Sequence, residues 1–259
     1  MNPIQADATL PRRVLVTGAG RGIGLSIARL LARDGFGLVL LTATETSAAK
    51  LRTEPFVRDS GAEVVAFDLA DPVEVAAFVE RWNSQLWGII HNAGVCETAP
   101  ITDIANDPWQ HVLGVNLEAP YRLTRGLLPH LARPGRIVTI GSQLSFEGRA
   151  GYGAYCASKF GLIGLTKCWA KELGREGITA NAICPGWVDT EMTVGDVERL
   201  ASEHGRNVAE FKAEIASPLE LKRFNTPDEV AELVAFLMSD KASGVTGRAW
   251  LMQTVWNQE

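Results

Sequence analysis

Short apolar runs alternate along the chain with longer segments in which apolar residues recur at helical spacing. The apolar runs are 13–17, 38–42, 63–67, 88–92, 136–140 and 179–183. Runs of this kind, separated by helical segments of about 10 to 25 residues, are typical of βαβ units. Because each unit returns the chain to a parallel strand, the pattern predicts an α/β fold. We expect a Rossmann-type doubly wound parallel sheet with helices on both faces.

Two helical segments add detail to this order. In N-T-P-D-E, Thr226 is the expected N-cap of a late helix, with Pro227 at its first position and Glu229 closing a capping box. Residues 191–222 interrupt the alternation because they are charged yet helical in pattern. We expect them to form a small helical substrate lid over one edge of the sheet.

Composition narrows the class of protein. The chain is 46% hydrophobic and 21% charged, and neither a repeat nor a low-complexity linker divides it. We therefore expect a loose leader at 1–10 and a single domain at 11–259. A net charge of −5 argues against a nucleic-acid partner. The longest apolar stretches fall short of the ~18 residues of a membrane span, and the N-terminus lacks a signal-peptide core.

The cysteines indicate neither disulfides nor a metal site. They stand at 96, 156, 168 and 184, without a CxxC pair and without metal-ligand spacing. Reduced thiols in a cytoplasmic protein are the simplest interpretation.

A glycine-rich turn, T-G-A-G-R-G-I-G at 17–24, joins the first predicted strand to the first predicted helix. Such a turn lets the backbone close on a pyrophosphate, which the N–H groups of the helix start then bind. Glycines also make tight turns without any ligand. The position in the first βαβ unit nevertheless favours a dinucleotide site.

The end of the second strand indicates which dinucleotide. An acidic residue there would hold the ribose 2′-hydroxyl of NAD, but the position is Thr42, and the first carboxylate is Glu45. Arg21 adds a cation that suits a 2′-phosphate, although it could also be a solvated residue at the helix start. NADP(H) is therefore favoured, and NAD(H) remains possible.

The octapeptide Y-G-A-Y-C-A-S-K at 152–159 places Tyr155 and Lys159 four residues apart. Residues at this spacing lie on one face of a helix. Alone, the octapeptide is more typical of an amphipathic helix that shows both side chains to water. Ser142 follows R-I-V-T-I-G and so ends a strand, where open α/β sheets bind ligands; a turn serine is the alternative.

Asn116 lies on the buried stripe of a predicted helix, four residues after Val112. Pro120 has no N–H, so the carbonyl of Asn116 lacks its helical partner and the helix should kink. A buried carbonyl needs another donor, and a bound water is the one we expect. A kinked structural helix with a satisfied asparagine is the alternative.

These motifs, with N-A-G at 92–94 and P-G at 185–186, occur in an order that resembles the short-chain dehydrogenase/reductase family over about residues 12–252. With L-T-A-T after the second strand, they are similar to the branch that contains 3-oxoacyl-(acyl-carrier-protein) reductases. The resemblance implies that Tyr155 is the acid/base and that Lys159 holds the nicotinamide ribose. It also implies that Ser142 positions the substrate oxygen and that Asn116 anchors a water relay. A homotetramer or homodimer is implied as well.

Most of the expected cofactor contacts are implied by the same resemblance. Together with the glycine turn they are Gly18, Gly20, Arg21, Gly22, Ile23, Gly24, Thr42, Asp68, Leu69, Asn92, Ala93, Gly94, Tyr155, Lys159, Pro185, Gly186, Val188 and Thr190.

The chemistry of Tyr155 supports its role independently of the resemblance. A phenol with a pKa near 10 is a poor base at neutral pH. An ammonium and an oxidised nicotinamide nearby would favour phenolate. A pKa lowered by about three units corresponds to roughly 4 kcal/mol of differential interaction, which two nearby cations in a partly dry cleft can supply.

The substrate pocket is expected to contain Gln143, Phe146, Trp187 and Met192, and Tyr152 is expected to be a wall residue or to pack at the helix entry. Apolar walls with few polar anchors are common in such pockets, although each aromatic is more often a core residue. His91, before N-A-G, is expected to be a packing residue. The C-terminal tail departs from the family pattern, and its Trp256 is expected at an interface or in a loose tail more than at a pocket.

The sequence therefore predicts an oxidoreductase that transfers a hydride between NADP(H) and a secondary alcohol or ketone. Two alternatives stay open. One is an NAD-dependent catabolic dehydrogenase of a sugar or cyclic alcohol. The other is a dinucleotide-binding sensor or scaffold without turnover.

Overall fold

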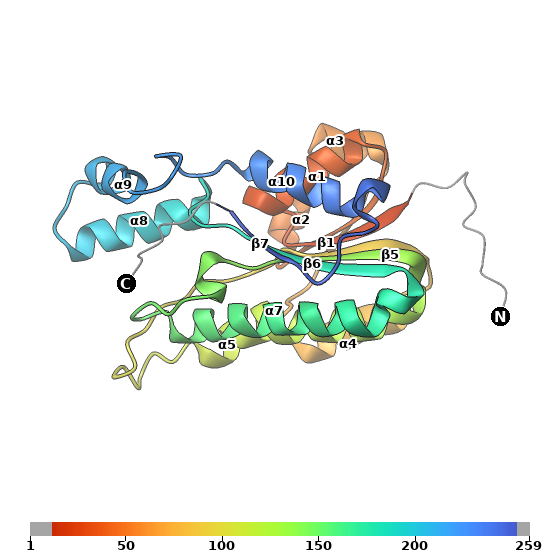
Figure 1. The fold of residues 1–259 in the computed structure, drawn as a ribbon, viewed down its shortest axis with the longest axis horizontal. Coiled ribbons are helices and arrows are strands. Elements are labelled where there is room, and N and C mark those ends of the chain that lie inside the picture. Colours follow the sequence, from red (N-terminus) through yellow and green to blue (C-terminus); the bar gives the residue numbers. More distant parts are fainter. Residues whose placement is uncertain (1–11, 253–259) are drawn as a thin grey trace.

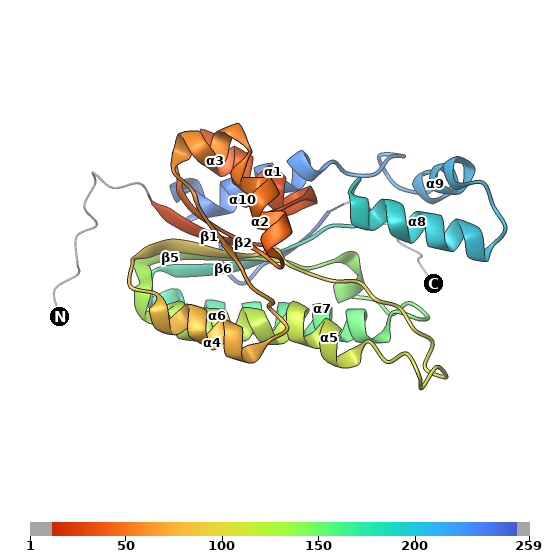
Figure 2. The ribbon, with the colours of Figure 1, turned by 180° about the vertical axis from the view of Figure 1, so that it is seen from behind.

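The computed structural model describes residues 12–252, within which seven parallel strands form one sheet of order β3-β2-β1-β4-β5-β6-β7 (Figures 1 and 2). The strands are β1 Arg13–Thr17, β2 Gly37–Thr42, β3 Glu63–Ala66, β4 Leu86–His91, β5 Leu131–Ile140, β6 Ile178–Cys184 and β7 Ala249–Leu251. The order runs outward in both directions from β1, which pairs with both β2 and β4. The predicted doubly wound parallel sheet is confirmed.

Helices cover both faces of the sheet. The helices are α1 Gly22–Arg33, α2 Glu45–Arg52, α3 Pro55–Ser60, α4 Pro72–Arg81, α5 Trp109–Leu113, α6 Ala119–Leu127, α7 Gly153–Leu173, α8 Glu191–Glu203, α9 Val208–Ala216 and α10 Pro227–Met238. The helices α1, α2, α3 and α10 lie on one face, and α4, α5, α6 and α7 lie on the other (Figure 1).

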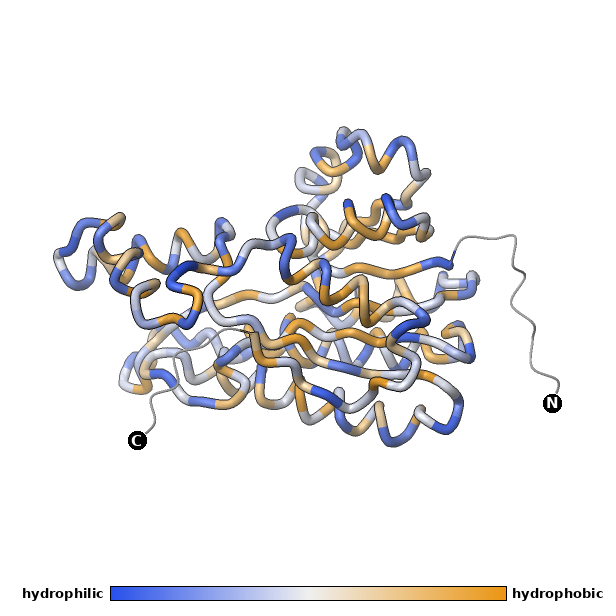
Figure 3. Tube along the Cα trace, turned by 45° about the horizontal axis from the view of Figure 1, so that its top comes forward, coloured by the Kyte–Doolittle hydropathy of each residue, from blue (hydrophilic) through white to orange (hydrophobic). Residues whose placement is uncertain are grey.

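The strand period of two explains how one sheet supports both layers. In β1, Val14 and Val16 belong to the apolar core beneath α1 and α10, whereas Leu15 belongs to the core beneath α4, α6 and α7. All three side chains are fully buried. Successive residues of a strand point to opposite faces, so a strand between two helical layers must be apolar throughout. Figure 3 shows this as apolar central strands within more polar helices.

The late helix begins as predicted. Thr226 accepts a hydrogen bond from the backbone N–H of Glu229, and the Glu229 carboxylate accepts one from the N–H of Thr226. The short strand β7 was not predicted, because its three residues follow a turn and carry no alternation of their own. Pairing with β6 defines it. The predicted leader at 1–10 and Trp256 lie outside the described residues.

The helix around Asn116 does not simply kink. Between α5 and α6 the backbone forms a π-helical turn over Gly114–Glu118, and Pro120 then occupies the first turn of α6. π-Helical turns are frequent at functional sites. Here the turn lies just before Pro120, which has no N–H to complete the regular α-helical hydrogen-bond pattern.

The segment predicted as a substrate lid forms a pair of helices, and its role over a substrate stays a prediction. α8 and α9 project beyond the carboxyl ends of the strands (Figure 1), and their inner side packs around Val197, Leu219 and Phe224. No helix within residues 12–252 is long and apolar enough to cross a membrane.

Candidate active site

The glycine turn lies where the strand order reverses, between the carboxyl ends of β1 and β4. Gly18 has a φ of +67°, and a Cβ there would stand 2.8 Å from the Cα of Ala93. The Asn92 side chain donates to the carbonyls of Thr17 and Gly18, at 2.9 and 3.1 Å. The Thr17 hydroxyl in turn accepts from the N–H groups of Asn92 and Ala93. Thr17 thus hydrogen-bonds the 92–94 turn to the start of the glycine turn, a role that the sequence did not suggest.

The turn is shaped for close approach of a backbone-bound group. Gly22, the first residue of α1, has a φ of +52°, and a Cβ on Gly24 would overlap the carbonyl of Gly18. The first N–H groups of a helix have no intrahelical partner and form an anion site. The residues present therefore fit the pyrophosphate of a dinucleotide.

We predict that Gly24→Ala disrupts this turn. The added methyl would meet the Gly18 carbonyl and the Asn92 amide, and neither can move without breaking the contacts just described. Overpacking of this kind costs about 1–3 kcal/mol of unfolding free energy. Urea denaturation should show that loss, and NADPH titration should show weaker binding. Gly244→Ala is the matched control, because a Cβ there meets nothing within 4 Å. Equal behaviour of the two variants would contradict the prediction.

The adenosine end of the site is less basic than expected. Thr42 is buried at the end of β2, where its hydroxyl donates to the carbonyl of Thr44 at 3.1 Å. Arg21 forms an ion pair with Glu191 of α8 at 3.0 Å, and both side chains are about two-thirds exposed. Arg21 therefore connects the glycine turn with the lid.

The predicted catalytic groups converge at the ends of β5 and α7. The Ser142 hydroxyl caps the turn after β5 by accepting from the N–H of Leu144, and the Tyr155 phenol lies near it. The Lys159 Nζ lies 5.6 Å from the centre of the Tyr155 ring and donates to the carbonyl of Ile140 at 2.8 Å. The helical spacing of four residues thus places the phenol and the ammonium side by side, as predicted.

Burial dominates the protonation of this cluster. It raises the pKa of Tyr155 well above its usual value, against which the nearby Ser142 side chain acts. Burial also lowers the pKa of Lys159 to about 8. The expected lowering of the phenol pKa is therefore not produced by the protein's own groups. An additional positive charge, such as that of an oxidised nicotinamide, would be needed.

Asn116 is fully buried and its amide is satisfied by the protein. Its Oδ1 accepts from the N–H of Val95 at 2.8 Å, and its Nδ2 donates to the carbonyl of Val95 and to the Ser158 hydroxyl. A Cβ on Gly94 would lie 3.4 Å from both the Asn116 Oδ1 and the Lys159 Nζ. Asn116 thus holds the 94–95 backbone against Lys159. The water relay stays a prediction.

The remaining predicted cofactor residues lie along the same edge of the sheet. Asp68 and Leu69 follow β3, while Pro185, Gly186, Val188 and Thr190 follow β6. The Pro185 carbonyl accepts from the N–H of Gln143, which joins this segment to the Ser142 turn. The Thr190 side chain lies against Gly22, because a Cβ added to Gly22 would be 3.3 Å from the Thr190 Cγ2.

A cavity of about 480 Å³ opens beside Ser142 and Tyr155. The predicted residues Gln143, Trp187 and Met192 line it, whereas Phe146 does not and is half exposed. A substrate contact for Phe146 therefore stays a prediction that this cavity does not support.

Three lining residues, Tyr152, Asp196 and Arg199, connect the cavity wall with α8, and neither Asp196 nor Arg199 had a predicted role. The Tyr152 hydroxyl, at the N-cap of α7, donates to the Asp196 carboxylate at 2.7 Å and accepts from Arg199 at 2.9 Å. Arg199 also forms ion pairs with Asp196 and Glu203. Asp196 and Arg199 lie three apart on α8, so their spacing was the available signal.

His91 behaves as a packing residue. Its Nε2 lies 2.7 Å from the Thr124 hydroxyl, and its ring packs against Trp169. Burial lowers the pKa of His91 to about 3, so the imidazole is neutral at physiological pH.

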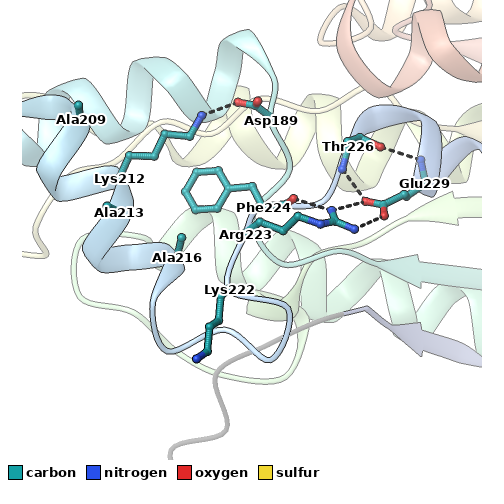
Figure 4. A pocket seen from close by; sticks show the side chains of 10 residues that line it. All are labelled: Asp189, Ala209, Lys212, Ala213, Ala216, Lys222, Arg223, Phe224, Thr226 and Glu229. Atoms are coloured by element: carbon teal, nitrogen blue, oxygen red, sulfur yellow. Dashed lines mark hydrogen bonds and ion pairs between the residues drawn. The ribbon is translucent and has the colours of Figure 1, made fainter.

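A second cavity, of about 520 Å³, lies between α9 and the start of α10 (Figure 4). Two ion pairs occupy its walls, Lys212 with Asp189 at 2.8 Å and Arg223 with Glu229. None of the four predicted catalytic side chains lines it. The cavity beside Tyr155 is therefore the candidate active site.

This chain is similar in sequence and fold to known proteins. The family model described as enoyl-(acyl carrier protein) reductase matches residues 18–253. D-beta-hydroxybutyrate dehydrogenase from Cupriavidus necator is 33% identical over 251 residues, which are 95% of this chain and 97% of that protein. A 3-oxoacyl-(acyl-carrier-protein) reductase from Pseudomonas aeruginosa is 37% identical over 241 residues, or 90% of this chain and 92% of that protein.

Solved structures agree. The complex of an actinorhodin polyketide ketoreductase variant with NADPH superposes with a TM-score of 0.84 at 33% identity, covering 93% of this chain and 95% of that one. Other similar structures also contain NADPH or NADP. The glycine turn described above is thus compatible with a nicotinamide dinucleotide.

Proposed function

Because this chain belongs to the short-chain dehydrogenase/reductase family, whose members are NAD(P)-dependent oxidoreductases, we propose that it interconverts a secondary alcohol and a ketone with NADP(H) and uses Tyr155 as the acid/base. We also propose that it acts in the cytoplasm as a homo-oligomer. The exposed Trp109 and Phe160, on α5 and α7, would form the contact. Light scattering measures the oligomeric state.

One observation carries the proposal. Ser142 and Lys159 both lie at the Tyr155 phenol, at the wall of a cavity that adjoins the glycine turn. A hydroxyl donor beside a phenol suits a carbonyl oxygen that develops negative charge during reduction. A dinucleotide sensor would not need this arrangement.

The nicotinamide, when bound, would supply the hydride in reduction and accept it in oxidation. In reduction, the Ser142 hydroxyl would hold the carbonyl oxygen while the Tyr155 phenol donates its proton to it. The raised pKa of Tyr155 keeps the phenol protonated at neutral pH, which suits proton donation. Lys159 would hold the ribose and, with Asn116 and a water, return a proton to the phenolate. In oxidation, the phenolate removes the proton of the alcohol.

An NAD-linked dehydrogenase is the second candidate. It is favoured by the ion pair between Arg21 and Glu191, because that pair engages the cation expected to bind a 2′-phosphate. The pair is largely exposed and therefore weak, so a phosphate dianion can displace the carboxylate. For this reason we retain NADP(H) as the preferred cofactor.

The proposal is tested by titrating the purified protein with NADPH and NADH while following nicotinamide fluorescence. Turnover of a panel of ketones and alcohols is then measured with the cofactor that binds. Tight NADPH binding with ketone reduction would support the proposal. Binding of neither dinucleotide would refute it, and binding without turnover on any substrate would favour the sensor.

We predict that Thr42→Asp reverses the cofactor preference. A carboxylate at the end of β2 would repel the 2′-phosphate of NADPH and accept a hydrogen bond from the 2′-hydroxyl of NADH. NADPH affinity should fall by roughly 10- to 100-fold at low salt, as expected for placing like charges in contact. Thr42→Ser is the matched control, because it keeps the hydroxyl without the charge. A Thr42→Asp variant with unchanged NADPH affinity would show that the 2′-phosphate lies elsewhere.

A further inference from the structure

The charged side chains of the active-site cavity are nearly all paired. Three arginines and three carboxylates line it. The pairs are Arg21 with Glu191 at 3.0 Å, Arg199 with Asp196, and Glu97 with His111 at 2.6 Å. Among residues 12–252, Arg149 has no carboxylate within ion-pair distance. Arg149, which is exposed, is therefore the arginine of this cavity without an ion-pair partner in the described part of the chain.

Arg149 is held in place by contacts that leave its hydrogen-bond donors available. Its guanidinium carbon lies 4.9 Å from the ring centre of Tyr152 and 5.5 Å from that of Trp187. A guanidinium over an aromatic face gains cation–π attraction, while its five N–H groups point outward in the plane. The two rings thus position the group without satisfying it.

The backbone that carries Arg149 is also fixed. The Tyr152 N–H donates to the Arg149 carbonyl at 3.0 Å, and Gly151 between them has a φ of +81°. The Gly151 carbonyl accepts from the N–H of Ala99 at 2.9 Å. This turn is a short connection from Ser142 to Tyr155, so Arg149 and the reacting groups belong to one continuous segment.

We propose that the substrate of this oxidoreductase carries a carboxylate, which Arg149 binds while the reacting carbonyl lies at Ser142 and Tyr155. This inference rests on the proposed function. The apolar side chains of Leu144, Trp187 and Met192 line the same cavity and suit the carbon chain between the two polar ends. The substrate class is therefore an oxo acid or the corresponding hydroxy acid.

A carboxylate fits better than a phosphate ester. A guanidinium matches a carboxylate through two parallel hydrogen bonds, and one cation neutralises one negative charge. A phosphate dianion would need a second cation, yet Arg199 is bound to both Asp196 and Glu203, and Arg21 is the cation proposed for the 2′-phosphate of NADP(H). Those carboxylates would also repel the additional charge.

The test compares oxo acids with their neutral counterparts. NADPH oxidation is measured with 4-oxopentanoate, 5-oxohexanoate and 6-oxoheptanoate, with their methyl esters, and with hydroxyacetone phosphate. The wild-type protein should prefer at least one acid over its ester by roughly 10- to 100-fold in kcat/KM, as expected for a charged hydrogen bond. Arg149→Met should abolish this ratio mainly by raising KM for the acid. Arg149→Lys should restore part of the ratio, because lysine keeps the positive charge but lacks the two parallel N–H donors of the guanidinium.

Arg58→Met is the matched control, since Arg58 lies on α3, is exposed and does not line the cavity. It should keep the wild-type ratio. Equal kcat/KM for acids and esters in the wild type, or a ratio that survives in Arg149→Met, would overturn the proposal. A preference for hydroxyacetone phosphate over every acid would overturn it as well.

Failure of the proposed function looks different. In that case no ketone, neutral or anionic, would be reduced by the wild type. The anion site is then tested by calorimetric titration of 6-oxoheptanoate into the protein with NADPH. Binding to the wild type but not to Arg149→Met would still support the site, whereas equal or absent binding in both would overturn it.

Discussion

Tyr155→Phe should reduce kcat for ketone reduction by roughly 100- to 10,000-fold, the range usual for loss of a general acid. The phenol is the group on which Ser142 and Lys159 converge, so its proton cannot be replaced by a neighbouring side chain. Phenylalanine keeps the ring and removes only the hydroxyl. NADPH affinity should therefore change little. Steady-state kinetics with a ketone and a separate fluorescence titration with NADPH measure the two effects.

Tyr121→Phe is the control for this experiment. Tyr121 is exposed on α6 and does not line the cavity, so the same chemical change there should leave kcat within about twofold, as is usual for surface substitutions. Retained turnover in Tyr155→Phe would refute Tyr155 as the acid/base. Loss of NADPH binding in that variant would instead indicate a structural role.

Lys159→Met should be inactive yet more stable than the wild type at pH 7. Burial lowers the pKa of Lys159 to about 8 from its usual 10.5, which corresponds to a folding penalty of about 3 kcal/mol for the charged form. Methionine removes that penalty but leaves the Ile140 carbonyl without its donor, at a cost of about 1–2 kcal/mol. The net gain in unfolding free energy should be about 1–2 kcal/mol.

The pH dependence separates this gain from ordinary packing effects. A lysine whose folded pKa lies below its unfolded pKa releases a proton on folding between the two values. The penalty is therefore complete below pH 8 and disappears as the pH rises from 8 towards 10.5. The difference in unfolding free energy between Lys159→Met and the wild type should shrink over that window. Above it the variant should lose its advantage.

Urea denaturation at pH 7 and pH 10, without added dinucleotide, measures this difference. Lys171→Met serves as control because Lys171 is exposed on the same helix and should show no such window. A Lys159→Met variant that is destabilised equally at both pH values would show that the buried ammonium carries no penalty. The kinetic loss would then need another explanation.

The sequence alone predicted the sheet because strand and helix periods are local properties. Buried parallel strands such as R-V-L-V-T must be apolar on both faces, and the capping box at Thr226 and Glu229 is complete within four residues. The spacing of Tyr155 and Lys159 is equally local, since one helical turn brings them together. Ser142 could be placed at a strand end for the same reason.

Contacts between distant segments could not be predicted in this way. The Thr17 hydroxyl accepts hydrogen bonds from the N–H groups of Asn92 and Ala93, more than seventy residues later. No local pattern around Thr17 predicts that contact. The pairing of Tyr152 with Asp196 likewise depends on where the lid lies. From the sequence, Tyr152 is expected only to be a wall residue or to pack at the helix entry.

The protonation of the site was also decided by the tertiary structure. The sequence suggested cations that would lower the pKa of Tyr155, but it could not show that the surrounding protein raises that pKa through desolvation. Local periodicity and capping determined the strands, the helices and the catalytic pair, because those depend on residues a few positions apart. The tertiary structure decided the lining of the cavity, the partners of Arg21 and the unpaired charge of Arg149. Burial and ion pairing depend on side chains that meet only when the whole sheet has assembled.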